Sequence, residues 1–202
     1  MKNPVTTTHE TYPDVYHDAY SRTIFGFWVY LMSDFILFGA LFATYAVLCA
    51  STFGGPSARD LFHLPFTLIQ TLLLLVSSFT AGLAGTAAHR KNQHLTLVFF
   101  GMTFFLGVLF MGMEIAEFSR LLNTGNNWDN SAFLSAYFTL VSTHGVHVLF
   151  GLLWIIILLL PVWREGVSHV SIRRLTCLRM FWQFLNIIWV FIFSFVYLMG
   201  VA

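Results

Sequence analysis

The chain has 202 residues, of which 57% are hydrophobic, 18% are aromatic and only 9% are charged, and its formal net charge is +1. A water-soluble domain carries roughly 25% charged residues because its surface must face water, so this composition indicates a protein that faces lipid. A net charge close to zero gives no reason to expect nucleic acid as a partner.

The first predicted element is a polar N-terminal tail over residues 1–23, which lacks the apolar core of a secretory signal peptide. We therefore expect membrane insertion to begin with the first membrane helix. Five apolar stretches follow, and each exceeds the ~20 residues that cross a bilayer as a helix. They cover residues 24–48, 64–88, 95–122, 132–162 and 177–200. Their short connections predict an all-α, polytopic membrane protein with a single bundle of five transmembrane helices.

The distribution of basic residues predicts the orientation of this bundle. If the N-terminus is cytoplasmic, the segments on that side hold Lys2, Arg22, Arg90, Lys91, Arg164, Arg173, Arg174 and Arg179, and the opposite segments hold only Arg59 and Arg120. Cytoplasmic loops of membrane proteins are enriched in Lys and Arg. We therefore expect a cytoplasmic N-terminus and, after five crossings, a C-terminus outside.

The first helix contains an ionisable residue at membrane depth. Asp34 lies about ten residues into it, roughly 15 Å from its cytoplasmic end. A carboxyl group at this depth is expected to be protonated, hydrogen-bonded, or beside water or lipid headgroups, because charge is costly in hydrocarbon. Asp34 could relay protons or fix a lipid; a hydrogen bond to a neighbouring helix is the structural alternative, and we prefer it.

The third helix carries three charged residues near its outer end. Glu114, Glu117 and Arg120 follow one another at intervals of three, so they share one helical face. Two close carboxylates resist ionising together, which makes a proton-sharing pair one interpretation. The preferred interpretation is that Glu117 pairs with Arg120 near the interface and that Glu114 bonds across helices.

The last two helices contribute histidines and amides. His144 and His147 are three apart in the fourth helix, and Gln183 and Asn186 are three apart in the fifth. Two histidines on one helix do not supply ligands for heme from different helices, and no Met-Cys-His cluster completes a copper site. We therefore expect no metal, no cofactor and no catalytic residue in this chain, and we interpret these side chains as interhelical hydrogen-bonding groups.

Four motifs follow one another along the chain. They are Phe25-Gly26-Phe27-Trp28 with Tyr30-Leu31-Met32-Ser33-Asp34, then Gly112-Met113-Glu114-Ile115-Ala116-Glu117-Phe118, then Thr143-His144-Gly145-Val146-His147-Val148, and finally Phe181-Trp182-Gln183-Phe184-Leu185-Asn186-Ile187-Ile188-Trp189 with Tyr197-Leu198-Met199-Gly200. Together they resemble subunit III of heme–copper terminal oxidases, over nearly all of the chain from Arg22 to Ala202. The five-helix length and the Met-Ser-Asp and Met-Glu-Ile variants are closer to quinol oxidases than to the seven-helix forms of many cytochrome c oxidases.

This resemblance implies a non-catalytic, cofactor-free subunit of a complex that oxidises ubiquinol, reduces O2 to water and moves protons outward across the bacterial inner (plasma) membrane. The family places heme and copper in subunit I. It implies that this chain flanks and stabilises subunit I, holds phospholipid in a cleft between its helix groups, and supports proton uptake. Subunits II and IV are expected in the same complex.

Individual positions also correspond to the family's pattern. Asp34 stands at the position of the family's buried cleft acid, and Glu117 matches its third-helix glutamate. Glu114 stands where cytochrome c oxidases often have Gln. His144 and His147 match the two motif histidines.

The fifth helix departs from the family pattern. Gln183 and Asn186 stand where the family usually has His and Asp. Neutral amides cannot act as an acid or a base, so the resemblance does not support proton movement at this place, although a packing role remains.

A second function class is a small proton-coupled transporter or channel that uses Asp34, Glu114, Glu117 and the histidines. Transporters commonly have repeated halves and broken helices around a central site. The sequence shows neither an internal repeat nor paired Gly or Pro interruptions. The oxidase subunit is therefore the preferred function, and the transporter is the alternative.

Overall fold

The computed structural model describes residues 15–49, 51, 64–125 and 128–201, and this part of the chain is helical apart from short connections. Its helices are α1 (Val15–Leu48), α3 (Leu64–His89), α4 (Gln93–Asn123), α5 (Ala132–Glu165), α6 (His169–Ile192), the π-helical segment η1 (Phe193–Leu198) and α7 (Met199–Val201). Five of the described helical spans are long and apolar enough to cross a membrane. The predicted fold class is therefore confirmed. The part of the expected tail before residue 15 lies outside the described residues.

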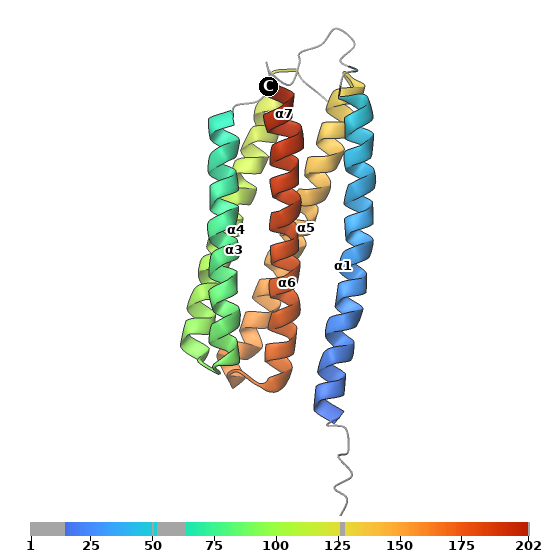
Figure 1. Ribbon diagram of the computed structural model, residues 1–202. Coiled ribbons are helices and arrows are strands. Elements are labelled where there is room, and N and C mark those ends of the chain that lie inside the picture. Colours follow the sequence, from blue (N-terminus) through green and yellow to red (C-terminus); the bar gives the residue numbers. More distant parts are fainter. Residues whose placement is uncertain (1–14, 50, 52–63, 126–127, 202) are drawn as a thin grey trace, which may run out of the picture.

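Four of the long helices form a compact group, and α1 stands beside it (Figure 1). α4 packs against α3 and α5, and α6 packs against the same two helices from the other side. α1 packs against α5 and α6. The start of α1, the α3–α4 turn and the α5–α6 turn lie at one end of the molecule, and the C-terminus lies at the other.

Helix ends extend beyond the predicted apolar stretches. α1 already begins at Val15, and α6 begins at His169, well before the apolar stretch that starts at residue 177. The start of α6 is fixed by Ser168, whose hydroxyl accepts a hydrogen bond from the backbone N–H of Ser171 at 3.1 Å. Apolar patterning locates the part of a helix that crosses the lipid, whereas caps and polar turns decide where the helix begins.

Small residues let bulky side chains enter the centre of the four-helix group. Trp182 of α6 is 1% exposed and lies against Gly107 of α4 and Gly151 of α5, where an added Cβ would come within 2.8 Å and 3.0 Å of its ring. The indole N–H of Trp182 donates to Ser77 Oγ of α3 at 2.9 Å. Helices in lipid are held together by such close packing and interhelical hydrogen bonds, because lipid supplies little hydrophobic drive between them.

Candidate functional site

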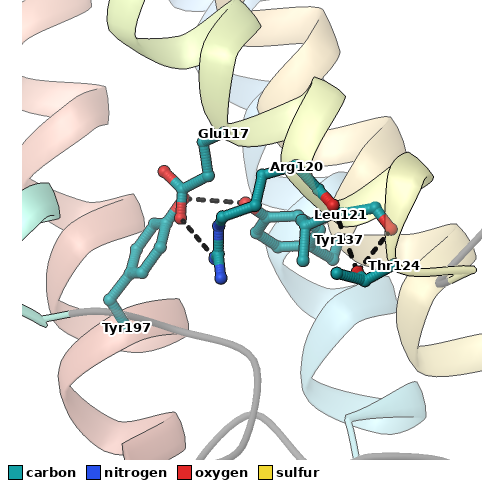
Figure 2. Close-up of polar contacts among 6 residues, drawn as sticks. All are labelled: Glu117, Arg120, Leu121, Thr124, Tyr137 and Tyr197. Atoms are coloured by element: carbon teal, nitrogen blue, oxygen red, sulfur yellow. Dashed lines mark hydrogen bonds and ion pairs between the residues drawn. The ribbon is translucent and has the colours of Figure 1, made fainter.

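Acidic and phenolic side chains lie where α4, α5 and η1 meet, and Figure 2 shows Glu117, Tyr137 and Tyr197 of this group. Glu114 and Glu117 of α4 are each 4% exposed. Tyr137 of α5 and Tyr197 of η1 are fully buried, and their hydroxyls form a hydrogen bond of 2.9 Å. Tyr197 belongs to the π-helical turn, a local widening of the helix that is common at functional sites.

Glu117 lies beside the two tyrosines and beside Arg120, the basic side chain drawn in Figure 2. Its Oε1 is 4.0 Å from a guanidinium nitrogen of Arg120, one turn later on α4, and it has no hydrogen-bond partner among the described residues. Arg120 is half-exposed, so it connects the buried carboxyl group to the end of the bundle. Thr124 closes the helix here by donating to the carbonyl oxygens of Arg120 and Leu121 at 3.1 Å and 2.9 Å.

Glu114 makes its contact with α5 by packing. A Cβ on Gly145 would lie 2.9 Å from Oε1 of Glu114, so the carboxyl group occupies space that only glycine leaves open. Its Oε2 is buried and has no hydrogen-bond partner in the described part of the chain. The spacing of the two glutamates therefore brings both carboxyl groups into the interior, but they meet different surroundings.

His144 joins α5 to α6. Its ring is 0% exposed, and Nε2 lies 3.2 Å from the backbone carbonyl oxygen of Leu185. The ring packs against Phe110 of α4 and Trp189 of α6, with centroid distances of 5.9 Å and 5.1 Å. His144 is thus held by one polar contact and two aromatic ones at the junction of three helices.

His147 instead faces α1. Its Nε2 lies 3.9 Å from Oδ2 of Asp34, and its Nδ1 lies 2.7 Å from the carbonyl oxygen of Thr143. The ring of Phe38, one turn after Asp34 on α1, packs on the imidazole with a centroid distance of 5.2 Å. The two motif histidines therefore contact different helices, His144 reaching α4 and α6 and His147 reaching α1, so they do not share one set of partners.

A groove of about 740 Å³ opens next to the Asp34–His147 pair, where α1 faces α5 and α6. Its wall is mostly apolar, and Tyr30 and His147 are its polar members. It is lined by Phe27, Tyr30, Val146, His147, Phe150, Leu153, Trp154, Ile157 and Phe181. A long apolar groove with a few polar groups suits a ligand with a hydrocarbon chain.

The amide pair of the fifth membrane span is separated by the fold. Asn186 is 5% exposed, and its Nδ2 donates to the carbonyl oxygen of Trp182 at 3.0 Å. Gln183 is exposed on the surface of α6. A spacing of three residues places two side chains on neighbouring positions of a helix, but it does not decide whether the boundary of the bundle runs between them.

The sequence motifs do not indicate which residues pair in the interior, although Trp189 and Tyr197 belong to the last motif. Tyr137 and Tyr197 are 60 positions apart, and Trp189 donates to Thr71 Oγ1 across 118 positions at 3.1 Å. No local pattern links such residues; the only signal is that hydroxyl and indole groups within apolar stretches need partners. Within residues that the structure describes, no three His, Cys, Asp or Glu side chains are grouped so as to hold a metal ion.

Comparison with known proteins gives one family and a consistent set of relatives. The family described as cytochrome c oxidase subunit III matches residues 11–201. Subunit 3 of cytochrome bo(3) ubiquinol oxidase from Pseudomonas aeruginosa is 50% identical over 184 residues, which cover 91% of this chain and 88% of that one. The corresponding protein of Buchnera aphidicola subsp. Baizongia pistaciae is 43% identical, covering 92% and 95%. Cytochrome c oxidase subunit 3 of Bacillus sp. strain PS3 is also 43% identical, covering 88% and 86%.

Proposed function

The chain belongs to the cytochrome c oxidase subunit III family, as its motifs predicted, and from this membership we propose that it is the cofactor-free accessory subunit of a proton-pumping terminal ubiquinol oxidase. The family match over residues 11–201 carries this proposal, because it includes all four motifs in order. Heme and copper belong to the catalytic subunit I in this proposal. The present chain flanks subunit I in the bacterial inner membrane, with subunits II and IV in the same complex.

Ubiquinol is proposed as the electron donor of the complex from the names of the relatives. The relative from Pseudomonas aeruginosa, at 50% identity, is named a ubiquinol oxidase subunit, whereas the Bacillus relative, named a cytochrome c oxidase subunit, is 43% identical. The deciding measurement is oxygen consumption by the purified complex with ubiquinol or with reduced cytochrome c. Ubiquinol should support turnover and cytochrome c should not; the reverse result would overturn the choice of donor.

The groove between α1 and α5 supports a role in holding phospholipid. Its volume of about 740 Å³ and its apolar wall suit acyl chains, and the polar pair of Asp34 and His147 lies beside it. We assign the lipid cleft of the family to this groove. Asp34, Glu114, Glu117, His144, His147, Gln183 and Asn186 are proposed as polar groups that join helices or contact lipid.

Support of proton uptake by subunit I is proposed for the end of the bundle that carries the α3–α4 and α5–α6 turns. This is the end that the basic residues assign to the cytoplasm, with the C-terminus on the periplasmic side. Lys91 and Arg164 lie at its exposed surface. Protons destined for subunit I would enter from this side.

Co-purification tests the proposed function directly. After gentle solubilisation, this chain should migrate with a large heme-containing subunit. Migration as a free oligomer without heme would overturn the proposal.

Substitution of Asp34 tests the lipid and proton-uptake roles in the complex. Asp34→Ala should leave helix insertion intact and weaken lipid retention or sustained turnover. Ser33→Ala, which changes the exposed neighbouring residue, should leave insertion, lipid retention and turnover unchanged. Unchanged lipid content and unchanged activity decay in Asp34→Ala would contradict the lipid and proton-uptake roles.

A further inference from the structure

The surface of α6 that lies between α1 and α3 carries two polar side chains within the membrane span. Gln183 is exposed, and Arg179, one turn earlier, is half-buried. The Nε of Arg179 is buried and has no hydrogen-bond partner among the described residues. Ile187 and Val190, the next residues of this stripe, are apolar and exposed, at 55% and 39%. Between Arg179 and Val190 this stripe therefore presents one amide and one guanidinium beside exposed apolar side chains.

Gln183 lies near the middle of the membrane. Its neighbour Trp182 bonds to Ser77, which stands halfway along α3 (Leu64–His89). An amide exposed to hydrocarbon loses its hydrogen bonds to water and gains none, which costs several kcal/mol. Its side chain is too short to reach the headgroups, unlike Lys or Arg, which extend toward the interface. A lipid-covered surface at this depth therefore leaves the amide unsatisfied.

The side chain of Arg179 extends toward α3 and adds a positive charge to this surface. A Cβ on Gly85 would come within 2.8 Å of Cδ and 2.9 Å of Nη1 of Arg179, so this side chain packs directly against the α3 backbone at Gly85. Further along the same stripe of α3, a Cβ on Gly82 would meet nothing within 4 Å. Small residues of this kind let another helix approach closely in a membrane.

The other border of this surface is also shaped to receive a side chain. A groove of about 220 Å³ lies between α1 and α6, and the side chains that line it are apolar. It is lined by Phe35, Phe38, Gly39, Phe42, Ile188, Phe191 and Phe195. Figure 1 shows α6 flanked by α3 on one side and α1 on the other. The surface thus combines an apolar groove, a central amide, a guanidinium and a small-residue stripe.

We propose that this α1–α6–α3 surface is the docking face for the heme-carrying subunit of the oxidase, through a partner helix that offers a hydrogen-bonding group at the depth of Gln183 and an acceptor or carboxylate to Arg179. The inference rests on the proposed function, since it names the surface through which that association occurs. Acyl chains offer no hydrogen bond at mid-membrane, whereas a partner helix can supply one from a side chain.

Photocrosslinking in the intact complex tests the face. The photoreactive residue p-benzoylphenylalanine replaces Gln183 in one variant and Phe105 in the control; Phe105 lies halfway along α4 and is 62% exposed. The expected result is a covalent adduct with the heme-carrying subunit from position 183 and none from position 105. An adduct from position 105 alone, or only lipid or self-adducts from position 183, would overturn the proposal.

Substitution tests the role of the amide itself. Gln183→Leu should lower the amount of this chain retained with the heme-carrying subunit several-fold in detergent, while Phe105→Leu should leave retention unchanged. Because Gln183 is exposed, thermal unfolding of the chain should not change, which separates lost docking from lost folding. Unchanged or improved retention would overturn the role of the amide.

The failure of the proposed function can be told apart from the failure of the docking face. If the wild-type chain does not co-purify with heme, the proposed function fails. If it co-purifies but gives no adduct from position 183, only the docking face is overturned.

Discussion

The four-helix group α3–α6 and the single helix α1 differ in how deeply they are buried and in the contacts that hold them in place. In the membrane-crossing window of α6, 56% of residues are buried, against 22% for α1. The four-helix group is joined by hydrogen bonds between helices, such as Thr80 Oγ1 to Thr103 Oγ1 at 2.8 Å. α1 is attached mainly by contacts between aromatic rings. The ring centroids of Phe27 and Trp154 are 5.8 Å apart, and those of Phe42 and Phe195 are 6.1 Å apart.

This difference in packing bears on where grooves open on the surface of the molecule. Gly107 and Gly151 bring their helices directly against the Trp182 ring in the core, whereas grooves of about 740 Å³ and 220 Å³ open where α1 meets α5 and α6. In the proposed assembly, lipid occupies the groove between α1 and α5 and a partner helix lies beside the groove between α1 and α6. The following variants test whether the core and α1 really differ in this way.

The largest expected effect is on the core at Trp182. Trp182→Ala removes a fully buried ring that contacts two glycines, and it leaves Ser77 Oγ without its donor. We expect a loss of about 3–5 kcal/mol in the free energy of unfolding. Denaturant titration of the chain in detergent, followed by circular dichroism, measures it. Trp163→Ala, at a site 67% exposed, is the matched control; equal losses in the two variants would contradict a tightly packed core.

A smaller effect is expected where the core has no spare volume. Gly107→Val inserts a branched side chain where even a Cβ would lie 2.8 Å from Leu152 and from Trp182. Overpacking of this kind costs about 1–3 kcal/mol. Gly101→Val, on the same helix, adds the same side chain where a Cβ meets nothing within 4 Å. The midpoint of thermal unfolding should be lower for Gly107→Val than for Gly101→Val. Similar midpoints would show that the core accommodates the added side chain as easily as the surface does.

These contacts mark the limit of what the sequence alone can predict. The five membrane spans follow from apolar length, and the family follows from four motifs in order, because both signals are local. The fact that Gly107 admits Trp182 is not local, since it depends on how α4 and α6 approach α5. Glycines in the apolar stretches indicate close packing, but they do not identify the partner.

The candidate site shows the same limit at single residues. Spacing predicts that Glu114 and Glu117 share a face, and both are buried. The same spacing groups Gln183 with Asn186, yet one is exposed and the other buried. Whether a polar residue faces the interior depends on the direction in which its helix meets its neighbours. That direction is set by the packing of the whole bundle and not by the residues next to it in sequence.

A still smaller effect is expected from one hydrogen bond in the core. Tyr137→Phe removes the hydroxyl that bonds Tyr197 at 2.9 Å while keeping the ring. Hydrogen bonds between membrane helices average about 0.6 kcal/mol, so we expect a loss of that order. Thr139→Val is the control, because the Thr139 hydroxyl donates to the carbonyl oxygen of Ser135 in its own helix at 2.7 Å. Unfolding titrations should rank Tyr137→Phe below wild type and Thr139→Val close to it; the opposite ranking would mean that interhelical bonds do not stabilise this group.

The smallest effect on stability is expected at the polar link of α1. Asp34 and His147 lie 3.9 Å apart, beyond hydrogen-bond length, and Oδ2 of Asp34 has no hydrogen-bond partner within the described residues. Asp34→Asn should therefore leave unfolding unchanged and should also leave the distance between spin labels at Val47 of α1 and Phe79 of α3 unchanged.

Phe38→Ala provides the contrast on the same helix. Phe38 is 0% exposed and contacts His147 and Phe184, with centroid distances of 5.2 Å and 6.4 Å. Loss of this ring should broaden or lengthen the spin-label distance, because apolar contacts hold α1 in place. If Asp34→Asn displaces α1 while Phe38→Ala does not, the polar link is the structural anchor. If the aromatic ring is the anchor, any loss of lipid or turnover in Asp34 variants must come from the chemistry of the carboxyl group and not from a misplaced helix.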